Sequence, residues 1–221
     1  MKKNINIYLD KSEMISDIVK NTDSVLDIGF WGQGIPMNNP YWVHGIIKKR
    51  AKEVYGVDLS FDTSLFDCEH YQKVSAEDFR FDRKFDVIIA SDLIEHLTNP
   101  GKLLDRCREH INPGGKIVIT TGTTFSLFNL AGKITREDPI NNYDHTCYFT
   151  PGTMKTLSKK CGLQVVSHSY IYTAHIEHKQ SLKKKFLNLV YWTLSKFTGK
   201  FCEEFVVIIS LPSKTHPSIA N

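Results

Sequence analysis

The fold of this chain is decided by the stretch Ser24-Val25-Leu26-Asp27-Ile28-Gly29-Phe30-Trp31-Gly32-Gln33-Gly34, in which an apolar run ends at three closely spaced glycines. Glycine adopts positive φ angles easily and lets a ligand approach the main chain where a Cβ would collide. A second apolar run, residues 54–58, also ends in a carboxylate. A glycine turn after one strand and an acid after the next predict a nucleoside site in a doubly wound α/β fold. The alternative is an ordinary strand-to-helix turn in which the glycines serve close packing alone.

The composition is that of an ordinary soluble globular protein. The 221 residues are 41% hydrophobic and 24% charged, and a net charge of +4 is too mild to indicate a nucleic-acid partner. The five cysteines are scattered and form no Cys-x-x-Cys pair, which predicts neither a disulfide framework nor a zinc site. The sequence shows no signal-peptide core and no run of about 18 apolar residues, so we expect a cytoplasmic protein.

Strand-like and helix-like stretches alternate along the chain, which predicts a parallel sheet covered by helices on both faces. Residues 85–90 form a near-continuous apolar run, as a strand buried on both faces requires. Strands are predicted at residues 24–28, 54–58, 71–74, 85–90, 116–120, 165–172 and 205–211, and helices at 10–20, 41–51, 103–111 and 151–161.

The chain is expected to form one domain over residues 1–211, followed by a flexible tail over 212–221. Residues 122–150 are rich in Gly, Thr, Asn and Asp without clear periodicity, which predicts a substrate loop. Residues 179–201 form a basic, aromatic insertion. Its helix, 182–200, either contacts a membrane surface peripherally or packs against the domain or the second subunit of a homodimer.

Five stretches, taken in order, resemble class I S-adenosylmethionine-dependent methyltransferases of the branch with a glutamate-histidine signature, similar to type 11 and type 23 methyltransferase domains. The stretches are residues 25–29, 56–60, 85–97, 104–115, and Asp144-His145 together with 149–151 and 161–163. The resemblance extends from residue 22 to residue 211. It implies an α/β fold with a doubly wound, Rossmann-like, mostly parallel sheet of seven strands, of which the last is antiparallel.

The resemblance also implies S-adenosylmethionine as the cofactor and S-adenosylhomocysteine as its product. Gly29 would let the backbone approach the methionine part, Asp27 would lie near its amino group, and Asp58 would bind the ribose diol. The other implied contacts are Gly32 and Gly34 in the glycine loop, Leu59 on the adenine face, Ala76 and Glu77 at the adenine edge, and the main-chain atoms of Ala90 and Ser91 at the amino acid moiety.

Two positions depart from the family pattern. The loop usually reads Gly-x-Gly-x-Gly, whereas Phe30 and Trp31 separate Gly29 from Gly32 in this chain. Many relatives carry an aspartate where this chain has Ser75, so the contact at the adenine edge would be weaker or would come from Glu77.

The expected reaction is direct in-line methyl transfer, which needs an aligned acceptor and a dry site but no covalent nucleophile. A hydroxyl acceptor also benefits from a general base, and His145, oriented by Asp144, is the candidate. The alternative for His145 is a structural role in its loop. His96 is expected to hold the loop after the fourth strand through hydrogen bonds. No metal site is predicted, because His175 and His178 lack a third ligand in the sequence.

The sequence therefore predicts an S-adenosylmethionine-dependent methyltransferase that acts on an oxygen of a small molecule or saccharide. One alternative is a membrane-associated acceptor, a quinone or a lipid-linked sugar, which would bring the protein to the inner membrane face. Another is an interaction module that binds the cofactor without turnover.

Overall fold

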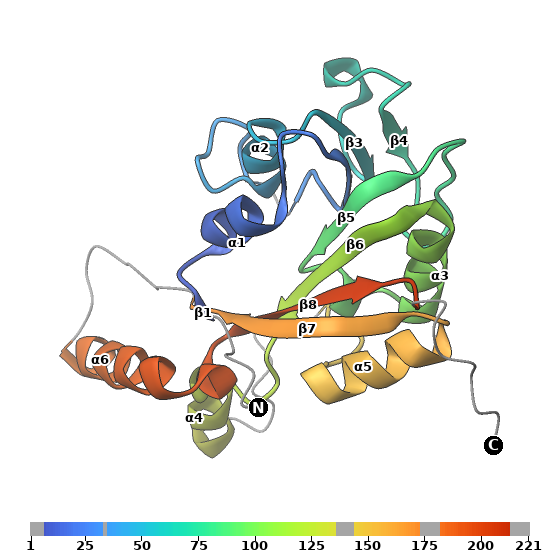
Figure 1. The fold of residues 1–221 in the computed structure, drawn as a ribbon. Coiled ribbons are helices and arrows are strands. Elements are labelled where there is room, and N and C mark those ends of the chain that lie inside the picture. The colour runs from blue at the N-terminus through green and yellow to red at the C-terminus, as the bar shows by residue number, and fades with distance from the viewer. Residues whose placement is uncertain (1–6, 33–34, 136–143, 173–181, 213–221) are drawn as a thin grey trace, which may run out of the picture.

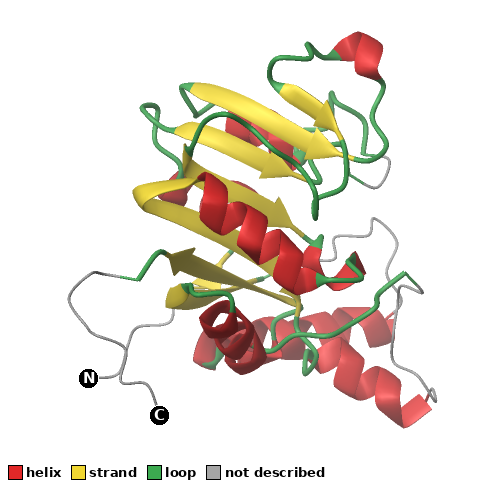
Figure 2. Ribbon diagram, turned by 90° about the vertical axis from the view of Figure 1, so that its right-hand side faces the viewer, coloured by secondary structure: helices red, strands yellow, loops and turns green. Residues whose placement is uncertain are grey.

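The computed structural model describes residues 7–32, 35–135, 144–172 and 182–212, which contain an eight-stranded sheet with helices on both faces (Figures 1 and 2). The strands are β1 Ile7–Tyr8, β2 Ser24–Ile28, β3 Glu53–Asp58, β4 Tyr71–Lys73, β5 Phe85–Ser91, β6 Ile111–Gly122, β7 Gln164–Ile171 and β8 Glu204–Ser210. The α-helices are α1 Lys11–Ile18, α2 Val43–Lys48, α3 Pro100–His110, α4 Leu127–Thr135, α5 Pro151–Lys160 and α6 Leu182–Phe197, and the 3₁₀ helices are η1 Thr63–Leu65, η2 Ile94–His96 and η3 Gly199–Phe201.

The strand order is β1-β7-β8-β6-β5-β2-β3-β4. Neighbouring strands are parallel except where β8 pairs with β6 and β7. The predicted mostly parallel sheet with an antiparallel last strand is thus confirmed. It has eight strands rather than seven, because Ile7 and Tyr8 pair with Tyr170 and Ile171 at the sheet edge. A strand of two residues is too short to show a period in the sequence.

β5 supports both layers of the core. Val87 and Ile89 belong to the apolar cluster beneath α1 and α2, whereas Ile88 and Ala90 belong to the cluster beneath α3 and α5. All four side chains are buried. Because successive side chains of a strand point to opposite faces, a strand between two helical layers must be apolar throughout.

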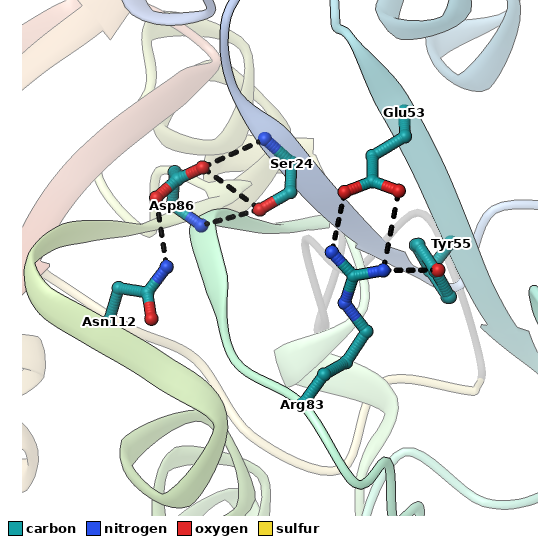
Figure 3. Close-up of polar contacts among 6 residues, drawn as sticks. All are labelled: Ser24, Glu53, Tyr55, Arg83, Asp86 and Asn112. Carbon is teal, nitrogen blue, oxygen red and sulfur yellow. Dashed lines mark hydrogen bonds and ion pairs between the residues drawn. The ribbon is translucent and has the colours of Figure 1, made fainter.

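Polar contacts fasten the amino ends of the central strands (Figure 3). The Asp86 carboxylate accepts hydrogen bonds from the N–H and hydroxyl of Ser24, both at 2.9 Å, and from the amide of Asn112 at 2.8 Å. These contacts, led by the Ser24 N–H, hold the pKa of Asp86 below its usual value. The Arg83 guanidinium likewise lowers the pKa of Glu53, with which it pairs. The opposite, carboxyl ends are where open α/β sheets bind ligands.

The capping pattern predicted α5 well, whereas the prediction for α3 missed its cap. α5 begins at Pro151 with Thr150 as its cap, and Thr153 completes a capping box. α3 begins at Pro100, three residues before the predicted start, because the Asn99 side chain caps its first turn.

Two regions differ from the sequence predictions. Helix α3 ends at His110, and residues 111–115, which precede the predicted strand 116–120, already belong to β6, with Gly114 at a φ of 82°. The predicted loop 122–150 contains α4. Its residues 136–143 lie outside the described residues, as do His175, His178 and the predicted tail from residue 213 onward.

The basic, aromatic insertion forms α6, which lies with α4 at one end of the molecule, below β7 and β8 (Figures 1 and 2). The Tyr191 side chain is buried and stacks on Tyr172, with ring centroids 4.8 Å apart, whereas Leu189 and Trp192 are exposed. One face of α6 therefore packs on its own sheet. Within the described part of the chain, no helix is long and apolar enough to cross a membrane.

Candidate active site

A cavity of about 740 Å³ opens beside the carboxyl ends of β2, β3 and β5. Ligand pockets for small molecules and cofactors span roughly 300–1,000 Å³, so the cavity is large enough for a nucleoside derivative. The residues predicted from the sequence that line it are Asp27, Gly29, Gly32, Asp58, Leu59, Ala76, Ser91 and Asp144.

Three predicted residues lie elsewhere. Among the residues that the structure describes, Glu77, Ala90 and His145 are not part of the cavity wall. The Glu77 carboxylate accepts hydrogen bonds from the Asn99 N–H at 2.9 Å and the Thr98 hydroxyl at 3.2 Å, so it fastens the segment that leads into α3. Gly34 lies outside the described residues.

The glycine loop begins at Gly29, whose φ is 78° and whose N–H donates to the Val57 carbonyl at 2.7 Å. A Cβ at Gly29 would stand 3.3 Å from both terminal methyl groups of Leu93, so Leu93 would have to shift to make room for it. Gly32 also has a positive φ, 68°, and a Cβ there would meet no atom within 4 Å. The loop thus exposes backbone to the cavity in a conformation that favours glycine at both positions.

The two residues that interrupt the glycine pattern anchor this loop. Phe30 is buried in an aromatic cluster with Trp42, and its carbonyl accepts a hydrogen bond from the Trp42 indole N–H at 2.9 Å. The Trp31 N–H donates to the Asp58 carboxylate at 3.1 Å. The Phe30 side chain and carbonyl therefore anchor the loop to the aromatic cluster, and the main chain of Trp31 ties it to the end of β3.

Asp58 presents a carboxylate of fixed orientation to the cavity. One oxygen accepts the Trp31 N–H, and the other accepts the Ser60 N–H at 2.9 Å. The second oxygen also accepts a long hydrogen bond from the Ser60 hydroxyl at 3.4 Å. A carboxylate oxygen has room for two hydrogen bonds, so the oxygen that accepts the Trp31 N–H retains accepting capacity, and the other regains it when the Ser60 hydroxyl turns away. A pair of vicinal hydroxyl groups is suited to this acceptor.

Asp27 belongs to a buried network of hydrogen-bonded side chains that the sequence did not reveal. Its carboxylate accepts a hydrogen bond from Nδ1 of His44 at 2.9 Å, and Nε2 of His44 lies 2.9 Å from the hydroxyl of Tyr71. Burial, with smaller contributions from Asp67 and Asp27, raises the pKa of Tyr71 to about 12. Tyr71 is therefore a neutral phenol hydrogen-bonded to His44, and these linked side chains fix the direction of the Asp27 carboxylate.

An ion-pair network that the sequence also did not reveal lies at the wall of the cavity. The ammonium of Lys11 pairs with Asp92 and, at 3.1 Å, with Glu204. Burial alone would lower the pKa of Lys11, but the two carboxylates outweigh it and hold that pKa above its usual value. Asp92 has a φ of 49°, rare outside glycine, and is held there by hydrogen bonds to Thr120. Strained backbone of this kind clusters at functional sites.

His145 lies beside His96, which lines the cavity. The two rings meet edge to face, with centroids 4.7 Å apart and an interplanar angle of 84°. Burial and the neighbouring His96 hold the pKa of His145 below its usual value, so the imidazole is neutral at pH 7. Burial and Asp92 raise the pKa of Glu95, the residue that precedes His96.

A sheet with this strand order and an antiparallel last strand, with a glycine turn after β2 and a carboxylate after β3, defines the class I methyltransferase fold. In agreement, residues 7–168 match the family described as "Methyltransferase domain". This match covers most of the chain, and the protein belongs to that family.

The ubiquinone biosynthesis O-methyltransferase of Cereibacter sphaeroides is 28% identical over 131 residues, which make up 57% of this chain and 53% of that protein. The enzyme of the same description from Colwellia psychrerythraea is 26% identical over 110 residues, 47% and 45% of the two chains. The chain thus spans about half the length of the curated relatives that it matches.

Solved structures share the fold. An S-adenosylmethionine-dependent methyltransferase from Archaeoglobus fulgidus superimposes with a TM-score of 0.58 at 20% identity, covering 89% of each chain. One from Clostridium acetobutylicum has a TM-score of 0.54 at 12% identity, covering 90% of this chain and 87% of that one. At these identities the likeness shows the fold alone.

Proposed function

We propose that the protein transfers the methyl group of S-adenosylmethionine to an oxygen atom of a small molecule. The observation that carries the proposal is the cavity in which the glycine loop faces the Asp58 carboxylate, itself held by two N–H groups. The family membership and the partial likeness to O-methyltransferases support methyl transfer to oxygen.

The lining residues fit this cofactor. Asp58 would accept hydrogen bonds from the two ribose hydroxyls, and Gly29 and Gly32 leave room beside the main chain for the methionine part. Asp27, directed by His44, would meet the amino group. The remaining contacts that we propose are Leu59 over the adenine, Ala76 at its edge and Ser91 at the amino acid moiety. When bound, S-adenosylmethionine supplies a methyl group that its sulfonium charge has already activated.

At the acceptor end, we assign to His145 the loss of the acceptor proton, with Asp144 beside it in the chain. A neutral imidazole is the form that can assist this loss, and the lowered pKa of His145 keeps it neutral at pH 7. Asp144 lines the cavity, so the two residues link the cofactor pocket to the predicted substrate loop.

A membrane-associated acceptor such as a quinone is the second candidate within this function. The observation that favours it is the exposed apolar surface at the α4 and α6 end: Ile134 is 87% exposed, Leu189 58% and Trp192 46%. Such side chains suit a lipid interface. Co-sedimentation with anionic vesicles, lost in Trp192→Ser, would support this acceptor class, and a saccharide acceptor predicts no vesicle binding.

The first test is calorimetric titration of the full chain with S-adenosylhomocysteine, followed by release of S-adenosylhomocysteine from S-adenosylmethionine in the presence of hydroxylated acceptors. We expect binding at one site, and turnover with an acceptor of the correct class. Binding with no turnover across phenolic, quinol and saccharide panels would indicate an interaction module. Absence of binding in a folded protein would contradict the proposal.

A further inference from the structure

Three side chains of types that can ligate a metal ion, Glu95, His96 and His145, meet next to the cavity. Each of Glu95, His96 and His145 has a potential ligand atom within 4.8 Å of a ligand atom of the other two. His96 lines the cavity and is in edge-to-face contact with His145. Two imidazoles and a carboxylate therefore converge at one end of the cofactor pocket.

One oxygen of the Glu95 carboxylate is buried without a hydrogen-bond partner among the described residues. Glu95 is only 4% exposed, and within the described part of the chain its Oε2 atom has no hydrogen-bond partner. Oε1 accepts a long hydrogen bond from the Gly122 N–H at 3.4 Å, and the Thr121 side chain and the Glu95 N–H also interact with this carboxyl. Buried carboxylate oxygens without partners are rare, because their desolvation is not compensated. A cation bound between Glu95 and the two histidines would compensate it.

The backbone builds this cluster from two segments far apart in the sequence. Helix η2, Ile94–His96, places Glu95 and His96 next to each other after β5. The Glu95 carbonyl accepts hydrogen bonds from the N–H of Thr146 at 2.8 Å and from its hydroxyl at 3.1 Å. The residue after His145 is thus fastened to η2, and His145 is held beside His96.

We propose that Glu95, His96 and His145 bind a divalent transition-metal ion of the zinc or manganese type. Imidazole ligands suit such ions, whereas magnesium prefers oxygen ligands. Two histidines and one glutamate also form a known ligand set of catalytic zinc sites, in which a position stays open. Adjacent ligands of such an ion lie roughly 3–3.5 Å apart, and the ligand atoms here lie within 4.8 Å of one another, so the side chains would have to close by at most about 1.3–1.8 Å.

The role of the ion rests on the proposed function. Its open position would accept an acceptor hydroxyl, and a bound cation makes loss of the hydroxyl proton easier. The acceptor oxygen then forms a bond with the methyl carbon, the carbon–sulfur bond breaks, and sulfur keeps the bonding pair as a neutral thioether. With His145 engaged as a ligand, the acceptor proton passes to solvent water, and His145 serves as the base only when no ion is bound. Acceptors with two adjacent oxygen atoms are favoured, because both atoms can share the ion.

The test measures cation binding directly. The chelator-treated full chain is titrated with Co²⁺ alone, and its visible absorption is recorded. We expect one ion per chain, with the bands of a low-symmetry site. Binding should weaken by more than roughly 100-fold in Glu95→Gln and in His145→Ala, since even changes outside the ligand set cost about 10–100-fold. His70→Ala, which removes an imidazole in an unrelated ion pair with Asp67, is the matched control and should bind normally.

A second measurement does not depend on the folding of a variant. Added Zn²⁺ or Mn²⁺ should raise the thermal unfolding midpoint of the chelator-treated wild-type chain, and Mg²⁺ should not. No stoichiometric Co²⁺ binding, or equal binding by wild type and both variants, would overturn the metal site. Full methyl transfer in excess chelator would overturn the role of the ion in the reaction, with His145 then acting as a base. Cation binding without binding of S-adenosylhomocysteine would uphold the site and reject the proposed function.

Discussion

Asp58→Ala should weaken cofactor binding without unfolding the protein. The carboxylate is positioned by the N–H groups of Trp31 and Ser60, so its two oxygens are oriented before any ligand arrives. Replacing it by alanine removes the acceptor for both ribose hydroxyls. It also frees the Trp31 N–H, which loosens the glycine loop.

The expected magnitude follows from this geometry. A hydrogen bond to a charged group contributes roughly 1.5–3 kcal/mol. Asp58 is only partly buried, so water replaces part of the lost interaction, and the two hydroxyls together should account for about 1.5–3 kcal/mol rather than twice that. This free energy corresponds to a rise in Kd of about 10- to 150-fold.

The assay is calorimetric titration with S-adenosylhomocysteine, with thermal unfolding as the check on folding. Asp62→Ala is the matched control, because the Asp62 carboxylate accepts the Ser64 N–H at 2.9 Å, as Asp58 accepts the Ser60 N–H. Asp62 does not line the cavity, so its variant should bind normally. Unchanged affinity in a folded Asp58→Ala protein, or equal loss in both variants, would refute the ribose assignment.

Three further predictions concern other parts of the molecule. Gly29→Val should abolish binding of S-adenosylhomocysteine while circular dichroism shows an intact sheet, because its Cβ would stand 3.3 Å from Leu93 and φ is 78°; normal binding would contradict the loop assignment. His44→Ala should lower the free energy of unfolding, measured in urea, by about 2–4 kcal/mol, because the buried polar groups of Asp27 and Tyr71 lose their hydrogen-bond partner. A change under about 1 kcal/mol would argue against the hydrogen bonds that link Asp27, His44 and Tyr71. Folding lowers the pKa of Asp86, so the stability that its ionised carboxylate contributes is present above the unfolded pKa of about 3.9 and is lost as the pH falls through the folded pKa. The urea unfolding midpoints at pH 7 and pH 3 should therefore differ less in Asp86→Asn than in wild type. An equal difference in the two proteins would disprove this.

The sequence by itself determined the elements whose signals are local. β2 was predicted with the bounds that the structure shows, because its apolar run ends at Gly29, and α5 was predicted from the cap Thr150 and the first-turn Pro151. The residues at the ends of β2 and β3 could also be found, since the carboxyl ends of adjacent parallel strands lie at the same edge of a sheet. Gly29 and Asp58 therefore came together as the order of the strands predicted.

The tertiary structure alone decided which distant side chains meet. No period or motif connects Lys11 with Asp92 and Glu204. The same holds for His44, which reaches Asp27 only because α2 packs over the end of β2.

The tertiary structure also decided which residues surround His145. Thr146 hydrogen-bonds to the Glu95 carbonyl across 51 residues, and this contact brings His145 to His96. Glu77 was predicted at the adenine edge, but its carboxylate instead accepts a hydrogen bond from the Asn99 N–H. The local sequence sets the conformation of a segment. Contacts between distant side chains depend instead on strand register, on helix packing and on the hydrogen bonding of buried polar groups, all of which arise only in the folded chain.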